Sequence, residues 1–351
     1  MRDHPLVSVI IPNYNYSRSL PFCLRALEEQ RYLRLEVIVV DDCSSDDSMD
    51  IARAHGVTVL STGRNSGCAG ARNLGVEHAK GEILFFLDSD VALAPDAVQQ
   101  AVTLLESDPG IGAVCGIYEP EPLIRDSLVE ECRSLQAHYW RRSSTGSVSF
   151  LFPSLCAMRA DVFRDVGPFN PRLRQTEEVD YGQRLTRAGY TVHLSAAVRG
   201  SHDDDHLLWP LLRKVFVRGR LRVPLYARRR RFAQGFETAS RAWACASALL
   251  AVVTCVLGAI FGDVIWLLPL GLFVVSLLCD LGMYRFVARY RSPRILACFI
   301  GAQFLFNFSV GAGISVGCLQ WLVSSKFRTL YDQETAAHEL VPFGGARGES
   351  H

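Results

Sequence analysis

The sequence lacks the marks of several common protein classes. Its 11 cysteines form no C-x-x-C pair, and we interpret them as small reduced hydrophobic residues rather than as a disulfide framework or a zinc site. The net charge is only +1 at pH 7, so no nucleic-acid partner is expected. No G-x-x-x-x-G-K motif occurs, and the glycines from Gly63 to Gly70 are not placed as in a dinucleotide fingerprint. Kinase and dehydrogenase functions therefore lose their main support.

No signal peptide is expected from the first residues. Residues Met1 to His4 are few and polar, and a strand-like run already begins at Val7, which leaves no room for an apolar leader. We therefore expect the catalytic part of the chain to stay in the cytoplasm.

Long apolar runs, in contrast, are gathered after Trp243. Spanning a bilayer takes about 20 apolar residues. Residues 243–261 and 264–283 each supply that length, and 295–323 is a third, less regular candidate. Arginines flank the first two spans on their outer sides, so the positive-inside rule places both flanks in the cytoplasm. We expect a multi-pass protein of an inner or plasma membrane.

The segment before these spans, Leu207 to Phe232, mixes apolar residues with many arginines. It is either a solvated surface helix or, as we prefer, a helix lying on the membrane against anionic lipid headgroups. The chain then divides into a catalytic domain (1–205), a basic interfacial segment (206–241), a membrane region (242–323) and a polar tail (324–351).

The first half alternates between strand-like and helix-like segments. Short β-branched or apolar runs predict strands at 7–11, 36–40, 57–60, 83–87 and 111–115, and apolar spacing predicts helices at 17–30, 44–56, 69–79, 97–105 and 178–188. Strands that alternate with helices are typical of an α/β domain with a mixed, mostly parallel sheet and flanking helices.

Polar side chains follow three of these predicted strands. Tyr14 comes after the first strand, Asp42 after the second, and Asp88 and Asp90 after the fourth. Ligands of α/β sheets bind at the carboxyl ends of strands. An acidic pair at a single strand end is more often a helix cap, but three such ends together favour a site. Carboxylates that lie so close to one another need a cation between them. Mg²⁺ or Mn²⁺ would be bound by one or two of the carboxylates and by phosphate oxygens of the substrate.

Five motifs stand in order in this half. They are Val7-Ser-Val-Ile-Ile-Pro-Asn-Tyr-Asn15, Val39-Val-Asp-Asp42, Asn65-x-Gly-x-x-x-Ala-Arg-Asn73, Asp88-Ser-Asp90 and Glu177-Glu-Val-Asp180. Together they resemble the inverting family-two glycosyltransferases of GT-A fold, over residues 5 to about 205. The resemblance implies an enzyme that takes a sugar from a nucleotide-diphosphate donor with the help of Mn²⁺ or Mg²⁺.

The resemblance also implies roles for single residues. Tyr14 would stack on the nucleobase beside Pro12, Asp42 would accept a hydrogen bond from the base, and Arg72 would lie near the diphosphate. Asp88 would touch the ribose or sugar, Asp90 would bind the metal, and His202 would be a further metal ligand or merely a polar loop residue. The implied nucleotide-sugar-binding set is Pro12, Tyr14, Asn15, Asp42, Asn65, Arg72 and Asp88.

The catalytic base is expected in the last motif. Family members usually carry Glu-Asp there, whereas this chain carries Glu177-Glu178, so the base is Glu178, which we favour, or Asp180. The acids could also simply stabilise the helix N-terminus. We expect a lipid-linked or glycan acceptor, since the spans would hold the site near membrane lipids. The alternatives are a polyprenyl-phosphate glycosyltransferase and a membrane protein that binds sugar nucleotides but has lost catalysis. A processive synthase is disfavoured because no Q-x-x-R-W motif occurs.

Overall fold

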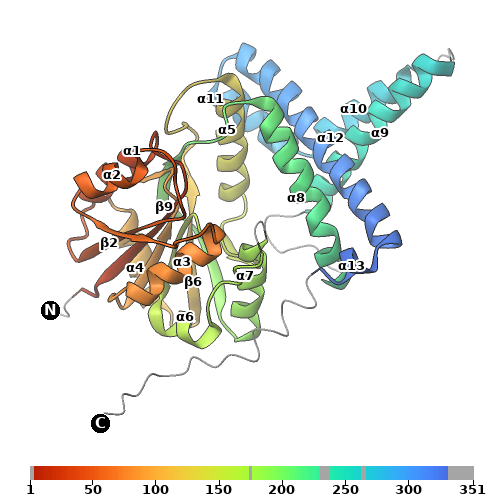
Figure 1. Cartoon of the computed structure of the whole chain (residues 1–351). Coiled ribbons are helices and arrows are strands. Elements are labelled where there is room, and N and C mark those ends of the chain that lie inside the picture. Colours follow the sequence, from red (N-terminus) through yellow and green to blue (C-terminus); the bar gives the residue numbers. More distant parts are fainter. Residues whose placement is uncertain (1–3, 174–175, 230–237, 262–265, 331–351) are drawn as a thin grey trace, which may run out of the picture.

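The computed structural model describes residues 4–173, 176–229, 238–261 and 266–330. Within them, an α/β domain with a central sheet occupies the N-terminal part, and a set of long helices packs beside it (Figure 1). The strands are β1 (Val7–Asn13), β2 (Leu35–Asp41), β3 (Thr58–Ser61), β4 (Ile83–Leu87), β5 (Val91–Leu93), β6 (Ile111–Tyr118), β7 (Gly146–Val148), β8 (Leu155–Arg159) and β9 (Thr191–His202).

In the described residues these strands form one nine-stranded sheet in the order β3-β2-β1-β4-β8-β6-β9-β5, with β7 also paired to β9. The first four strands are parallel neighbours, as the sequence predicts. Beyond β4 the sheet becomes mixed, because β8 runs antiparallel to both β4 and β6. The sheet is therefore an open mixed sheet of the GT-A kind.

Helices cover both faces of the sheet because strand side chains alternate between them. Val9 and Ile11 of β1 belong to the core under α1, α2 and α4, whereas Ile10 belongs to the core under α3, α6 and α7. The helices of this domain are α1 (Leu20–Glu28), α2 (Ser48–Ala54), α3 (Gly67–His78), α4 (Ala97–Ser107), α5 (Leu128–Arg142), α6 (Ala160–Val166) and α7 (Glu177–Arg187).

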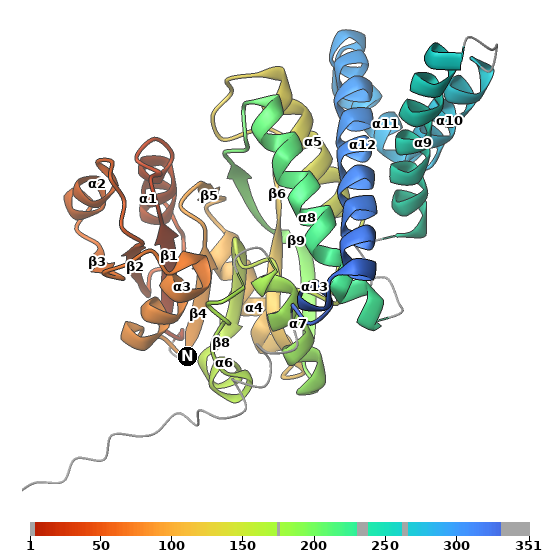
Figure 2. The same ribbon diagram turned by 45° about the vertical axis from the view of Figure 1, so that its right-hand side comes forward.

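The C-terminal helices stand beside the domain, and α8 lies between the sheet and α12 (Figure 2). They are α8 (Leu208–Arg229), α9 (Ala239–Phe261), α10 (Leu267–Leu278), α11 (Leu281–Tyr290), α12 (Pro293–Val323) and α13 (Ser325–Arg328). The two helices α8 and α12 approach closely. A Cβ on Gly313 would lie 2.2 Å from the backbone oxygen of Phe216, and one on Gly317 would lie 2.7 Å from that of Arg220. Two glycines spaced four apart thus allow α12 to pack directly on α8.

Two helices in the described part of the chain are long and apolar enough to cross a membrane, namely α9 and α12. The predicted second span at 264–283 is not one straight helix, because α10 and α11 meet there at an angle of 72°. Asp280 stands at this break, 3.1 Å from the indole nitrogen of Trp140 on α5. This contact joins the break to α5 of the catalytic domain, two residues after the apolar helix α10 ends at Leu278. The predicted turn at Gly262 and Asp263, and the tail from 331 onward, lie outside the described residues.

The predicted interfacial segment corresponds to α8, although residues 230–237 lie outside the described part. One side of α8 packs on α12, and Arg222 on another side faces Glu178 of the catalytic domain at 3.9 Å. Arg291, one of the basic residues that follow α11, binds Glu121 at 2.8 Å and Glu131 at 3.0 Å. This basic flank is therefore attached to the catalytic domain through ion pairs.

Candidate active site

The acids that follow β2 and β4 meet in one pocket, as expected from the strand ends. Asp42, Asp88 and Asp90 all line it, and so does Tyr14, whose ring is half exposed. The pocket lies at the carboxyl edge of β1, β2 and β4. Its described lining is Pro12, Asn13, Tyr14, Tyr16, Asp42, Cys68, Ala71, Asp88, Ser89 and Asp90.

Asp42 faces the N-terminus of α3 as well as the pocket. Its carboxylate accepts hydrogen bonds from the backbone of Ser66 at 2.7 Å and of Gly67 at 2.8 Å, and from the hydroxyl of Thr62 at 2.8 Å. Burial opposes ionisation, but these hydrogen bonds hold the pKa of Asp42 below its ordinary value. Its neighbour Asn65 donates to the Asp42 carbonyl at 3.3 Å. Asp42 lines the pocket and Asn65 holds its backbone, and the contacts of both residues with a nucleobase remain a prediction.

Asn15 has a structural function in this rim. Its backbone has φ of +59°, and its side-chain oxygen accepts from the backbone nitrogen of Ser45 at 2.7 Å. The link joins the loop after β1 to the loop after β2 and presents Tyr14 at the pocket mouth.

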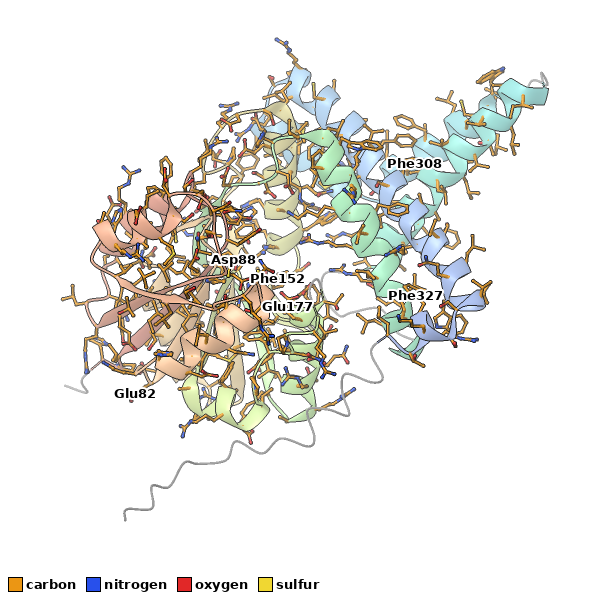
Figure 3. The ribbon with its side chains drawn as sticks, viewed as in Figure 1. Glu82, Asp88, Phe152, Glu177, Phe308 and Phe327 are labelled. Carbon is orange, nitrogen blue, oxygen red and sulfur yellow. The ribbon has the colours of Figure 1, made fainter. Side chains whose placement is uncertain are left out.

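Arg72 of α3 joins the β4 end to α7. Its guanidinium donates to Asp88 at 2.7 Å and to Glu177 at 3.4 Å, and its side chain is only 3% exposed. Burial disfavours the charge, but the two carboxylates raise the pKa of Arg72 above its ordinary value. Figure 3 shows Asp88 and Glu177 close together at this junction. A role of Arg72 near the diphosphate remains a prediction; in this geometry it positions Asp88.

Asp90 and His202 come together at the end of β4 and β9. The imidazole Nε2 lies 3.6 Å from Asp90 Oδ2, and Nδ1 lies 3.1 Å from Asp204. The ring stacks on Tyr118 with centroids 4.4 Å apart. Asp90 Oδ1 is buried and has no hydrogen-bond partner among the residues that the structure describes, and a buried carboxylate oxygen without a partner is costly. The described residues contain no group of three or more potential metal ligands, and a metal bound by Asp90 and His202 remains a prediction.

Comparison with known proteins agrees with this geometry. The glycosyl transferase family 2 model matches residues 8–167. Glycosyltransferase AglE of Haloferax volcanii is 31% identical over 233 residues, which cover 63% of this chain and 74% of AglE. The chain belongs to glycosyl transferase family 2. Further members of the family are similar over shorter or weaker stretches. A PGL/p-HBAD biosynthesis glycosyltransferase of Mycobacterium tuberculosis is 26% identical over 64% of this chain and 86% of its own length.

A solved structure supports the fold of this family 2 glycosyltransferase over nearly its whole length. The mannosyltransferase PcManGT from Pyrobaculum calidifontis, solved in complex with GDP-Man and Mn²⁺, has a TM-score of 0.56 and 19% sequence identity. The similarity covers 92% of this chain and 89% of PcManGT, and therefore includes the C-terminal helices.

The two candidate bases of the family 2 chain differ in their surroundings. Asp180 Oδ2 is bound to Arg184 at 3.0 Å, and Arg184 also donates to the carbonyls of Val166 and Pro168. Glu178 Oε1 lies farther from a cation, at 3.9 Å from Arg222 Nη2, and the charge of Arg218 also acts on it. Burial and the adjacent Glu177 raise the pKa of Glu178 to about 7, although Arg222 opposes the shift. A pKa near 7 suits a base that acts at neutral pH.

Several residues of the site are not apparent from the sequence. Glu177 was treated only as the companion of Glu178, yet it holds Arg72. Tyr118 and Asp204 orient His202 from two sides. The acidic run after His202 was the only sequence signal for Asp204, whereas no pattern indicates Tyr118, because it becomes a neighbour only through the pairing of β6 with β9.

Proposed function

We propose that this family 2 glycosyltransferase transfers a sugar from a nucleotide-diphosphate donor to a hydroxyl of a membrane-borne acceptor, with inversion at the anomeric carbon. The observation that carries this proposal is the convergence of Asp88, Asp90 and His202 at one sheet edge, next to the acids of α7. These residues would bind the charged diphosphate of the donor, and the adjacent acids of α7 would supply the catalytic base.

The donor would enter through the pocket mouth. The exposed ring of Tyr14 and the adjacent Pro12 suit the face of a nucleobase, while Asp42 lines the pocket and is held by Asn65. Asp88 is 30% exposed and is held by Arg72, so its free oxygen suits a ribose or sugar hydroxyl. Buried polar groups that are already fixed bind such hydroxyls with little reorganisation.

Asp90 and His202 would hold the divalent metal. The partnerless Oδ1 of Asp90 and the nearby imidazole fit a cation, and their small number suits Mn²⁺ or Mg²⁺, which takes further oxygens from substrate phosphates. When bound, the metal would neutralise charge on the diphosphate leaving group. PcManGT was solved with Mn²⁺, which supports the same class of cofactor here.

The residues of α7 would carry the proton transfer. Glu178 takes the proton of the acceptor hydroxyl, and the oxygen attacks the anomeric carbon from the face opposite the leaving group. The bond from that carbon to the diphosphate oxygen breaks with its electron pair on the departing nucleoside diphosphate. The products are the glycoside of inverted configuration and the nucleoside diphosphate, and the proton resides on Glu178 until solvent removes it.

The acceptor would be a lipid-linked glycan or another lipid of the membrane. The α9 and α12 helices could span a bilayer, and α8 connects α12 to the side of the domain that carries Glu178. A site so attached faces molecules that lie in the membrane.

The proposal is tested by donor turnover and product stereochemistry. Full-length protein in detergent is screened with UDP-, GDP- and dTDP-sugars for a thermal shift in the presence of Mn²⁺, and the binding donor is then assayed for release of nucleoside diphosphate with and without the metal. We expect metal-dependent release and an inverted product by NMR. A product of retained configuration would contradict the single displacement, and the absence of release with every donor would favour a protein that binds but does not transfer.

A further inference from the structure

A cluster of arginines lies where α8 meets the catalytic domain, and the chemistry above does not use it. Arg218 and Arg222 stand four residues apart on α8, so they share one side of the helix. Arg133 approaches them from α5, and its charge acts directly on Arg218. Arg222 Nη2 is 3.9 Å from Glu178 Oε1. The three side chains, Arg133, Arg218 and Arg222, are named the arginine cluster.

The nearby acids are mostly committed to other cations. Asp204 lies 3.6 Å from Arg133 but closer to His202, at 3.1 Å. Asp205 is bound to Lys214 at 2.8 Å. In the described part of the chain, Arg218 itself has no ion pair within 4.0 Å. Like charges gathered in a partly buried place attract an anion, so the cluster has the electrostatic character of an anion site.

Burial and the neighbouring charge of Arg133 lower the pKa of Arg218, which is the direction expected for a guanidinium without an adequate counter-ion. Structural ion pairs have the opposite effect, as Arg72 between its two carboxylates shows. A bound anion would therefore act as the counter-ion of Arg218.

The shape of the cluster selects the kind of anion. Guanidinium groups present planar pairs of donors that match phosphate oxygens, and several of them can hold one phosphate from different directions. The cluster lies on the α8 side of Glu178, whereas the predicted donor diphosphate lies on the Asp88 and Asp90 side. A phosphate held by the arginines would thus belong to the acceptor.

The packing of α8 on an apolar helix favours a phosphate that belongs to a lipid. The other side of α8 packs on the apolar helix α12, whose outer surface carries exposed Leu319, Leu322 and Val323. We propose that the arginine cluster binds the phosphate or diphosphate of a lipid-linked acceptor and so brings the acceptor hydroxyl to Glu178. This inference rests on the proposed function, because it assigns the acceptor of the same site.

Phospholipid headgroups also carry phosphates, so binding of a lipid-linked acceptor must be distinguished from binding of the bulk membrane. An exposed arginine on α8 provides this comparison. Arg213 is exposed on the same helix and is not part of the cluster. Arg213→Gln therefore removes one positive charge from α8 while it leaves the arginine cluster intact, which makes it the matched control for Arg218→Gln.

The test measures binding of farnesyl phosphate to full-length protein in detergent, without donor, by calorimetry. We expect Arg218→Gln to raise the Kd at least about tenfold, as for loss of a charge-assisted phosphate contact, and Arg213→Gln to change it less than about twofold. In a second arm, cosedimentation with phosphatidylglycerol vesicles should be weakened by Arg213→Gln and not by Arg218→Gln. Unchanged farnesyl phosphate binding in Arg218→Gln, or an equal loss of vesicle binding in both variants, overturns the proposal.

Two further measurements keep the result unambiguous. Arg218→Lys retains the charge but not the planar fork, so a Kd raised by about threefold or more in a variant with wild-type melting excludes misfolding as the cause. Because binding is measured without turnover, a chain that binds farnesyl phosphate through Arg218 but transfers no sugar contradicts the proposed function alone. A chain that transfers sugar to a lipid-phosphate acceptor equally well with Arg218→Gln contradicts only the inference about the cluster.

Discussion

The ionisation of Glu178 determines how activity should depend on pH. Its pKa is raised to about 7 by burial and by Glu177, and the base must be deprotonated to accept the proton of the acceptor. With this pKa, about one-tenth of the enzyme is active at pH 6 and about nine-tenths at pH 8. We therefore expect kcat/KM to rise about tenfold between these values, with its inflection near pH 7. For an unperturbed glutamate the profile would be flat over this range.

The assay is initial-rate sugar transfer at subsaturating acceptor, with metal and donor saturating at every pH. Glu178→Gln should lower kcat/KM by a factor of about 10² to 10⁴, because general base catalysis contributes that much to the rate. The inflection near pH 7 should also disappear in this variant. Asp180→Asn is the control: it breaks a pair with Arg184 at 3.0 Å and should lower stability while the inflection stays near pH 7.

Arg222 supplies a second perturbation of the same group. It lies 3.9 Å from Glu178, and the two side chains are 25% and 22% exposed. At such a separation the attraction is about 1 kcal/mol in a water-like dielectric, which corresponds to somewhat less than about 1 pH unit. Arg222→Gln should therefore move the inflection upward by about that amount. A profile that is flat from pH 6 to pH 8 in the wild type, or unmoved in Arg222→Gln, would refute the assignment of Glu178 as the base.

Four other outcomes follow from the same contacts. Asp90→Asn should abolish both turnover and the thermal shift on adding Mn²⁺, with an unchanged circular dichroism spectrum; near-normal activity would remove the metal hypothesis. Arg72→Leu should lower the free energy of unfolding in urea by about 3 kcal/mol, since it leaves the mostly buried carboxylate of Glu177 and the partly exposed one of Asp88 without their cation. Gly313→Leu should lower the Tm in detergent because its side chain meets the backbone of α8, whereas Gly301→Leu, with nothing within 4 Å, should not. Because the pKa of Glu178 is raised from 4.5 in the folded chain, the folded state binds more protons than the unfolded state, so stability falls as pH rises from 4.5 to about 7; Glu178→Gln should raise the Tm at pH 8 and not at pH 4.

The strands and helices nearest the N-terminus could be predicted because their burial follows a simple period. The predicted strands at 7–11 and 83–87 correspond to β1 and β4, and the predicted helix at 97–105 corresponds to α4. Helix α5 was not predicted, since its buried side chains include Glu130 and Arg141 as well as apolar residues. A helix that buries charged groups against ion-pair partners elsewhere in the chain has no apolar stripe to detect.

The candidate site could be predicted as far as strand ends determine it. Asp42, Asp88 and Asp90 meet because parallel strands end at the same edge. The link from Asp88 through Arg72 to Glu177 could not be predicted, because its partners are 16 and 105 residues from Arg72 and no local pattern connects them. Sequence patterns thus indicated which residues carry charge at the edge, but not which of those charges the protein neutralises by itself.

That distinction separates the acids in the first turn of α7. Asp180 and Glu177 each have a guanidinium within 3.4 Å, that of Arg184 and that of Arg72 respectively. Glu178 lies in the same turn of α7 but at 3.9 Å from its cation, and burial leaves it able to take up a proton near neutral pH. The Glu178 carboxylate faces Arg222 of α8. We therefore propose that Glu178 is the base for an acceptor that approaches along α8, on the side of the apolar helices.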